Sequence, residues 1–245
     1  MRLRKFVLAA LLIASAGGAS VGLYPIATAT AAPTLLTTCT TIVGSGSYKL
    51  ANNLFSNFDN DCLRINQGVM NVTIDLDGFT IQCVTEALFC TTGIGIRVVD
   101  VIEGLTVRNG TVKGFRFGLH LYGNSIIIER MHLIRNTDQG LLAVESIRLI
   151  DNLFIGNGFG AQVGEGSVIT GNEFSFNTTH GLRAGVGSTV VNNVARRNGG
   201  TGIRVACPSA VVGNTATANT GANLVLADNA TRPCAAENNV PAPAP

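Results

Sequence analysis

The sequence predicts an all-β protein in which short parallel strands wind into a solenoid with about 21 residues per turn. Three observations support this fold class. The chain repeats itself at that period, it is rich in Gly, Asn, Val, Ile and Thr, and it contains no Trp. Each repeat also holds short runs of alternating apolar residues separated by Asn or Gly. Such runs are too short for helices and are typical of strands joined by tight turns.

The repeat is clearest in four segments that begin at Ser146, Ser167, Ser188 and Ser209. Two columns of asparagine pass through them at this same, nearly constant period. The first column holds Asn152, Asn172, Asn193 and Asn214, and the second holds Asn136, Asn157, Asn177, Asn198 and Asn219. Asn tolerates unusual turn backbone, and its amide can both donate and accept hydrogen bonds. We therefore predict that each column forms a hydrogen-bonded ladder between successive turns.

Each repeat contains three strand-like runs, so we predict three parallel sheets around one apolar core. The side chains expected to point inward are Leu149, Ile169, Val190 and Val211 in the first run, Leu133, Phe154, Phe174, Ala195 and Ala216 in the second, and Leu141, Leu182, Ile203 and Leu224 in the third. The frame extends upstream through 124–145, 104–123 and 71–82, with a turn about ten residues longer around Cys83 to Cys90. We expect about seven turns in total.

The segment 1–32 has the pattern of an export signal. Three basic residues precede the apolar run Phe6 to Ala16, which is too short to span a bilayer. Small-residue cleavage sites follow at Ala27-Thr28-Ala29 and Ala29-Thr30-Ala31. We expect cleavage and a secreted, periplasmic or cell-surface protein that has no membrane contact once the signal is removed. The alternative is an uncleaved anchor, because residues 6–24 carry no charge.

Charge and cysteine content restrict the possible partners further. Three of the 17 basic residues and none of the 15 acidic ones lie in the signal, so the mature chain has 14 basic against 15 acidic residues and a net charge of about −1. This balance does not indicate a nucleic-acid partner. Six cysteines in an exported chain suggest disulfides, and their order suggests the pairs Cys39–Cys62, Cys83–Cys90 and Cys207–Cys234. They lack the spacing of a zinc site, and we expect no metal or other cofactor.

The two ends of the solenoid are expected to be capped, because open sheet edges invite aggregation. We assign 33–70 to an N-terminal cap with the first strands, in which 39–66 is irregular and folds over the first turn. The helix proper is assigned to 71–228. Residues 229–245 are assigned to a C-terminal cap and a disordered tail, which ends in PAPAP.

Several segments resemble the right-handed parallel β-helix superfamily, which is also described as pectate-lyase-like or pectin-lyase-like. They are SYKLANNL (47–54), NVTIDLDGFTIQ (71–82), GLTVRNGTVKGF (104–115) and the asparagine repeats. The superfamily includes pectate lyases, polygalacturonases, alginate epimerases and many secreted bacterial proteins of unassigned role. The resemblance covers roughly 45–228 and implies a single-stranded right-handed parallel β-helix, or solenoid. It does not by itself assign a function, because one scaffold hosts several chemistries.

The catalytic segments of the enzymes in this superfamily are missing from the sequence. Of the polygalacturonase-like motifs, only the fragments THG (179–181) and GIR (202–204) are present, and the DPHE segment of alginate epimerases is absent. Hydrolysis requires two carboxylates that flank the scissile bond. Asp75 and Asp77 share one strand face, but no His or Arg partner is expected beside them, so we interpret them as an exposed face or turn ladder. No clustered acids that could hold calcium are visible, and no catalytic residue is assigned.

One row of outward side chains is the best candidate for a ligand site. In the third strand, the residue after the inward position must face outward, because strand side chains alternate. Those residues are Arg97, His120, Leu142, Gln162, Arg183 and Arg204, and we take all but Leu142 as candidate ligand-binding residues. Parallel strands stack roughly 4.8 Å apart, a scale comparable with the repeat of an extended sugar chain. The arginines could hold carboxylates or sulfates. The alternative is an outer face that is simply polar.

These observations favour a monomeric, non-catalytic extracellular module that binds a carbohydrate or has a structural or surface role. The alternative is a polysaccharide lyase or glycoside hydrolase that acts on a uronate-containing polymer through Arg97, His120, Arg183 and Arg204. Calcium is expected only for that alternative. His120, His132 and His180 are otherwise expected to be surface or turn residues, and three scattered His do not make a copper site.

Overall fold

The computed structural model describes residues 31–57, 60–84, 90–227 and 231–241. The chain divides into the units Met1–Ala31 and Ala32–Pro245. The predicted signal lies outside the described residues apart from its last two positions, and so do the final four residues of the predicted disordered tail. Within the described ranges, no helix has the length and apolar character needed to cross a membrane.

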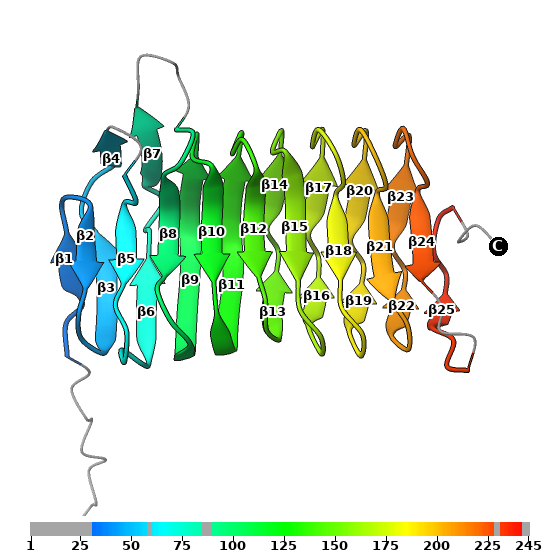
Figure 1. Ribbon diagram of the computed structural model, residues 1–245, viewed down its shortest axis with the longest axis horizontal. Helices are drawn as coiled ribbons and strands as arrows, with labels where there is room; N and C mark the ends of the chain where they lie inside the picture. The colour runs from blue at the N-terminus through cyan, green and yellow to red at the C-terminus, as the bar shows by residue number, and fades with distance from the viewer. Residues whose placement is uncertain (1–30, 58–59, 85–89, 228–230, 242–245) are drawn as a thin grey trace, which may run out of the picture. The chain divides into compact units, whose positions relative to one another are not determined.

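The unit Ala32–Pro245 is a parallel β-solenoid, which confirms the predicted fold class (Figure 1). Nine strands, one for each turn, form the sheet that faces the viewer in Figure 1. In order these are β2 (Thr40–Ile42), β5 (Leu63–Ile65), β8 (Ile94–Val98), β10 (Phe117–Leu121), β12 (Gln139–Ala143), β15 (Phe159–Val163), β18 (Leu182–Ala184), β21 (Ile203–Ala206) and β24 (Leu224–Ala227). The expectation of about seven turns was therefore too low.

The other strands form one sixteen-stranded sheet that covers two faces of the solenoid. One face consists of β1 (Thr34–Leu36), β3 (Gly46–Leu50), β6 (Val72–Asp75), β9 (Ile102–Lys113), β11 (Gly123–Ile134), β13 (Ile147–Ile150), β16 (Val168–Thr170), β19 (Thr189–Val191), β22 (Ala210–Val212) and β25 (Ala235–Glu237). The other consists of β4 (Leu54–Asn57), β7 (Thr80–Val84), β14 (Leu153–Ile155), β17 (Glu173–Ser175), β20 (Val194–Arg196) and β23 (Thr215–Thr217), together with the second halves of β9 and β11.

Two of the three predicted sheets are thus joined, because β9 and β11 each run for 12 residues around the corner between them. Gly110 and Met131 pair with each other at this corner. From Asn152 onward, a ladder asparagine occupies this corner on each turn and separates two short strands. On the first of these turns, the Oδ1 of Asn152 accepts a hydrogen bond from the Met131 backbone N–H at 2.9 Å. Asn152 therefore marks the first turn on which one long strand is replaced by two short strands, β13 and β14.

Both asparagine columns form the predicted ladders. At each step the backbone N–H and the Nδ2 of one Asn donate to the Oδ1 of the Asn on the next turn; from Asn157 to Asn177 the distances are 3.0 and 3.1 Å. The same Nδ2 also donates to the carbonyl of Leu133 on the preceding turn. The structure adds Asn239 to the first column and Asn223 to the end of the second. Because all but the C-terminal members of the two columns are buried, each ladder satisfies polar groups that would otherwise be costly.

The ladder asparagines themselves do not have a left-handed backbone conformation. This differs from the expectation that Asn is present because it tolerates unusual turn backbone. The left-handed conformation falls on the residue before each of them; Asp151 has φ 53° and Gly156 has φ 67°. The asparagines are therefore required for their amide hydrogen bonds and not for their backbone tolerance. A third corner uses serine instead: the Ser188 N–H donates to Ser209 Oγ at 3.0 Å, and Ser188 Oγ donates to the Gly185 carbonyl.

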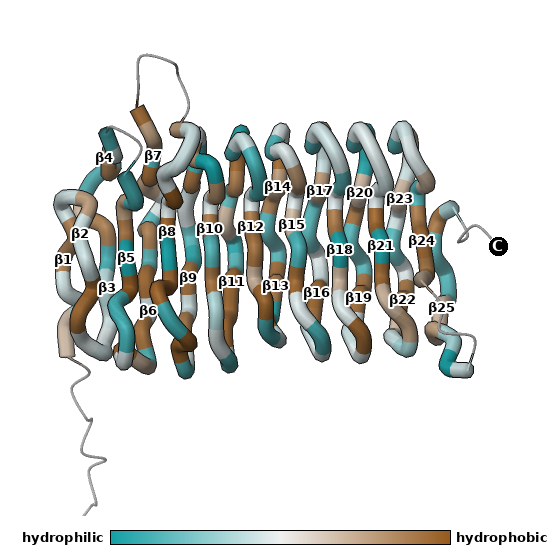
Figure 2. The backbone as a smooth tube through the Cα atoms, in the orientation of Figure 1, coloured by the Kyte–Doolittle hydropathy of each residue, from teal (hydrophilic) through white to brown (hydrophobic). Residues whose placement is uncertain are grey.

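The predicted core is confirmed, since every side chain assigned inward is buried. Equivalent residues stack on successive turns; the rings of Phe154 and Phe174 lie 4.9 Å apart and nearly parallel. Figure 2 shows the corresponding alternation of hydrophobic and hydrophilic residues along the strands. A column of glycines lies at the start of strands in the nine-stranded sheet, where successive turns approach closely. A Cβ on Gly140 would lie 2.6 Å from the Gly160 carbonyl oxygen and 3.0 Å from Asn157 Nδ2.

The three predicted disulfides are present, with Cα–Cα distances of 4.4 Å for Cys39–Cys62, 5.9 Å for Cys83–Cys90 and 4.9 Å for Cys207–Cys234. The prediction that 39–66 is irregular was wrong. This segment supplies β2 to β5, which stack in register on later turns, and its Ile42 and Leu50 join the core. Its strands are only three to five residues long, so their alternation is hard to recognise in the sequence. Residues 231–241 likewise add β25 to the sheet.

Asp75 and Asp77 have basic partners, contrary to the expectation that none lies beside them. Asp75 Oδ2 lies 2.9 Å from Arg108 Nε, and Asp77 Oδ2 lies 2.9 Å from Lys49 Nζ. Burial raises the pKa of the Asp75 carboxyl, but hydrogen bonds from the Asp77 backbone, Asn109 and Arg108 outweigh it and hold this pKa below its ordinary value. The ion pairs span adjacent turns, because Asp75 pairs with Arg108 in the sheet register. Both aspartates thus contribute to contacts between turns.

Candidate functional site

The predicted outward row exists as one line across the nine-stranded sheet. The register pairs Arg97 with His120, His120 with Leu142, Leu142 with Gln162, Gln162 with Arg183 and Arg183 with Arg204. The structure adds Arg64, which pairs with Arg97, to the N-terminal end of the row. The sequence did not reveal Arg64, because its spacing from Arg97 is longer than the period of the repeat. We call this line of side chains, from Arg64 to Arg204, the arginine row.

A second line of side chains runs beside the arginine row, three residues earlier on each strand, and its first two members, Ile94 and Phe117, are buried. The register places Ile94, Phe117, Gln139 and Phe159 in this line. His180 continues it, because its ring lies 5.2 Å from that of Phe159 in an edge-to-face arrangement. Its aromatic members had no assigned role in the sequence, because regular alternation of strand side chains would place residues three positions apart on opposite faces. The face therefore combines a polar row with a partly aromatic one.

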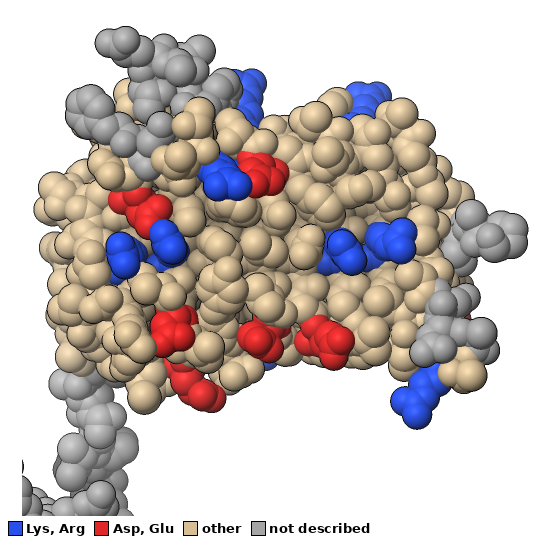
Figure 3. Space-filling view, in the orientation of Figure 1, with Lys and Arg blue, Asp and Glu red and all other residues tan. Residues whose placement is uncertain are grey.

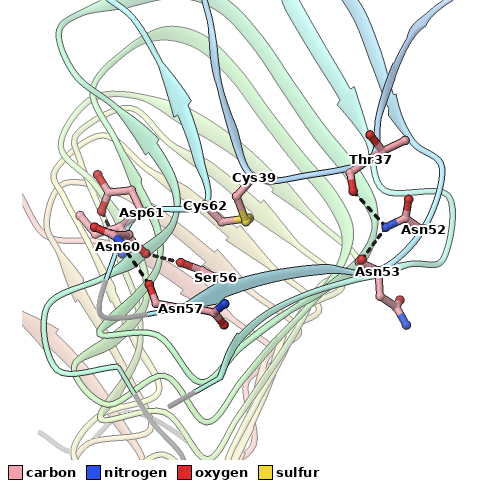
Figure 4. The surroundings of a disulfide bond; sticks show 10 residues. Thr37, Cys39, Asn52, Asn53, Ser56, Asn57, Asn60, Asp61 and Cys62 are labelled. Carbon is pink, nitrogen blue, oxygen red and sulfur yellow. Dashed lines mark hydrogen bonds between the residues drawn. A yellow bond between two sulfur atoms is a disulfide. The ribbon is translucent and has the colours of Figure 1, made fainter.

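A hollow of about 520 Å³ contains the N-terminal pair of arginines, Arg64 and Arg97. Asp61 lies in the same hollow, and its Oδ2 is 3.3 Å from Arg97 Nη1. Its Oδ1 accepts a hydrogen bond from the Ile94 N–H, so this carboxylate is fixed by the strand beside it. The neighbouring Cys39–Cys62 disulfide and the bonds of Asn60 and Ser56 hold the surrounding chain in place (Figure 4). Asp61 thus orients and partly neutralises Arg97, while Arg64 stays exposed.

A second hollow, of about 210 Å³, contains the C-terminal pair of arginines, Arg183 and Arg204, together with Phe159, His180 and Leu182. The Thr201 N–H donates to His180 Nδ1 at 2.8 Å, so neutral His180 carries its proton on Nε2, where it can act as a donor. Both arginines are exposed. No carboxylate within the described ranges forms an ion pair with either of them. The second hollow is therefore the more positive of the two.

The middle of the arginine row carries no charge at neutral pH. His120 stacks on Phe117 with ring centroids 5.0 Å apart and lies 4.8 Å from the Tyr122 ring. Burial lowers the pKa of His120, as do the nearby Arg97 and Arg116, and the Asp61 carboxylate opposes them only in part. Its Nε2 is buried and makes no hydrogen bond within the described part of the chain. His120 thus contributes an aromatic surface, and its buried Nε2 is not placed to exchange protons with a ligand.

Acidic residues border the middle of this face. Asp100, Glu145 and Glu165 are exposed in the connections that follow β8, β12 and β15. Figure 3 shows a group of basic side chains toward each end of the middle of the face, with acidic side chains along its lower edge. Arg116 lies 5.0 Å from the centre of the Phe117 ring and pairs with Asp138 at 3.4 Å. An anionic ligand would therefore be attracted mainly at the two ends of the row.

The chain belongs to the right handed beta helix region family, whose model matches residues 95–240 and so covers more than half of the 245 residues. The predicted superfamily and the right-handed winding are thereby confirmed. A search of curated proteins finds no match.

Solved structures with a similar fold include a mutant of the periplasmic alginate epimerase AlgG, at 17% identity and a TM-score of 0.46 over 77% of this chain and 59% of that one. The A-module of the Azotobacter vinelandii mannuronan C-5 epimerase AlgE4 matches at 14% identity and a TM-score of 0.42, covering 76% of this chain and 72% of that one. Tailspike protein 3 of bacteriophage CBA120 matches at 13% identity and a TM-score of 0.42, covering 86% and 51%. These likenesses concern the fold alone, and this chain spans about three-fifths of the length of that AlgG chain.

Proposed function

We propose that this protein is exported and binds an acidic polysaccharide along the arginine row without cleaving it. The observation that carries this proposal is the register of the nine-stranded sheet, which places Arg64, Arg97, Arg183 and Arg204 in one line. Arginine binds carboxylates and sulfates through two parallel hydrogen bonds, so a line of arginines suits a chain of such groups.

The shape of the face also suits an extended ligand. Successive positions of the row are roughly 4.8 Å apart, which is close to the repeat of an extended sugar chain. Phe159 lies beside the row, is partly exposed and offers an apolar ring to the C–H groups of sugar rings. Gln162 and His180 supply further hydrogen-bonding groups between and beside the arginines. Charge, stacking and hydrogen bonding are thus combined on one surface.

The same geometry favours binding over catalysis. Hydrolysis of a glycosidic bond requires two carboxylates, and among the described residues Asp61 is the one carboxylate that lines either hollow. That carboxylate is engaged by Arg97 and by a backbone N–H. The alternative, a lyase or hydrolase that uses Arg97, His120, Arg183 and Arg204, requires a group that exchanges protons with the substrate, and the Nε2 of His120 is buried.

Export is supported by the three disulfides, because such bonds persist in oxidising compartments. The basic and apolar pattern of residues 1–32 supports the same location. A location outside the cytoplasm would also bring the protein into contact with extracellular or periplasmic polysaccharides.

Binding can be tested by calorimetry with pectate and alginate at low and high salt. We expect Arg183→Gln to weaken binding about tenfold or more, because a charge-assisted hydrogen bond is worth roughly 1.5–3 kcal/mol. Added salt should weaken binding as well, because it screens exposed charges. Arg148→Gln is the matched control, since Arg148 is an exposed arginine on the sixteen-stranded sheet. Equal losses in the two variants, or no binding to either polymer, would contradict the proposal.

Catalysis is tested separately with the same polymers, with and without calcium. We expect neither absorbance from an unsaturated product nor release of reducing ends. Turnover that is abolished by Arg183→Gln would replace the binding function with the enzymatic alternative.

A further inference from the structure

We propose that the arginine row is a bipartite site, in which two cationic subsites hold two separate anionic groups of one polysaccharide chain across an uncharged middle. This inference rests on the proposed polysaccharide-binding function and makes it more specific. The preferred ligand would be a long oligomer with acidic residues near both ends and neutral residues between them.

The two subsites are physically separate. Each hollow on this face contains two arginines on adjacent strands, Arg64 with Arg97 in one and Arg183 with Arg204 in the other. Four strand-to-strand steps lie between Arg97 and Arg183. At roughly 4.8 Å per step, the inner arginines are about 19 Å apart along the row. If one sugar occupies one turn, a ligand needs about five residues to contact both.

The middle of the row gives no advantage to a charged sugar. Its side chains are His120, Leu142 and Gln162, and burial together with Arg97 and Arg116 favours the neutral form of His120. Glu145 and Glu165 follow the strands that carry Leu142 and Gln162, so an anion over this part would meet carboxylates of the same sign. Phe159 borders the same stretch and presents a partly exposed ring to a neutral sugar, and His120, stacked on the buried Phe117, adds a second aromatic surface.

The two subsites are expected to differ in strength. The N-terminal hollow holds Asp61 beside its arginines, whereas the lining of the C-terminal hollow contains no carboxylate among the described residues. A short acidic oligomer should therefore occupy mainly the Arg183 and Arg204 subsite. A long oligomer engages the second subsite intramolecularly, which raises its affinity by the effective concentration of the tethered group.

The test is calorimetric titration of the full-length mature protein with galacturonate oligomers of increasing length. We expect affinity to change little among oligomers too short to span both subsites, and then to rise on the order of a hundredfold at about five residues. Arg97→Gln and Arg183→Gln should each abolish this rise. Arg97→Gln should leave the binding of short oligomers unchanged, whereas Arg183→Gln should weaken it. Arg148→Gln, on the sixteen-stranded sheet, serves as the control that should keep the rise.

The possible results distinguish failure of the bipartite site from failure of the proposed polysaccharide-binding function. A smooth increase with every added residue, retained in both variants, would show one continuous site and overturn the inference while leaving polysaccharide binding intact. No binding at any length would overturn the proposed function itself. A long oligomer with methyl-esterified middle residues should bind at least as tightly as the fully acidic one. Weaker binding of the esterified oligomer would contradict the claim that the middle of the row gives no advantage to charged sugars.

Discussion

At the scale of single residues, the corners of this solenoid depend on a left-handed backbone conformation that glycine adopts at little cost. Gly156, Gly171 and Gly213 occupy this conformation directly before ladder asparagines. Ala218 occupies the same position before Asn219, with φ 54° and an exposed side chain. This conformation costs a residue other than glycine roughly 1–2 kcal/mol, because the Cβ lies close to the following carbonyl oxygen.

We predict that Ala218→Gly stabilises the protein by about 1 kcal/mol, because it removes this strain while the Asn219 bonds are kept. The measurement is the free energy of unfolding from urea titration. Ala222→Gly is the control, since Ala222 is also exposed but does not have a positive φ. It should destabilise the chain through unfolded-state entropy. If both variants lose stability equally, strain at Ala218 is not significant.

At the scale of the elements, the last strand depends on covalent attachment. β25 is three residues long and pairs only with β22 among the described strands. Its backbone contacts include the Ala235 N–H to the Ser209 carbonyl at 2.9 Å, and Asn239 ends the first ladder. The Cys207–Cys234 disulfide closes a loop of sequence separation 27 and holds this strand against the preceding turn.

We predict that Cys207→Ser combined with Cys234→Ser releases β25 while the inner turns stay folded, at a cost of about 3 kcal/mol for this loop length. Hydrogen exchange of the Ala235–Glu237 amides should then lose its protection. The variant Cys83→Ser with Cys90→Ser, near the other end of the solenoid, should leave the protection of β25 unchanged. Full protection of β25 without its disulfide would show that strand pairing alone holds this end.

At the scale of the whole unit Ala32–Pro245, stability is built from contacts between neighbouring turns. Each ladder step, core stack and ion pair joins one turn to the next, as Asn157 does to Asn177 and Asp75 does to Arg108. Stability in such an array is close to a sum of repeat terms and nearest-neighbour terms. One complete turn can therefore be removed when the register of the rest is preserved.

We predict that deletion of residues 146–166 leaves a folded solenoid with one turn fewer. The deletion brings Asn136 onto Asn177 and Leu142 beside Arg183, so both the ladder and the sheet continue. It also shortens the gap between Arg97 and Arg183 by roughly 4.8 Å, so the length at which oligomer affinity rises should fall by about one sugar residue. Circular dichroism and the same titration series measure both effects.

Deletion of residues 146–155 alone is the matched control for that variant. It displaces the later strands from the repeat frame and should abolish the folded spectrum. An unchanged length threshold in the folded deletion variant would contradict the bipartite site.

The periodicity of the sequence was enough to predict the repeat, both asparagine ladders, the inward side chains and most of the arginine row. These features recur at a nearly constant period, and such a period converts directly into stacking of equivalent positions. The disulfide pairs also followed from cysteine order along the chain. The nature of the ligand did not follow, because an outward row specifies charge and spacing but not sugar stereochemistry.

The features that break this period became visible only in three dimensions. Arg64 joins the row, Arg108 contacts Asp75, and Asp61 contacts Arg97 across separations of 33 to 36 residues. The partly aromatic line beside the arginine row and the two hollows form only where strands from several turns lie side by side. The reason is that backbone hydrogen bonds align strands in space regardless of how much chain loops out between them, so a longer turn changes the sequence spacing but not the register.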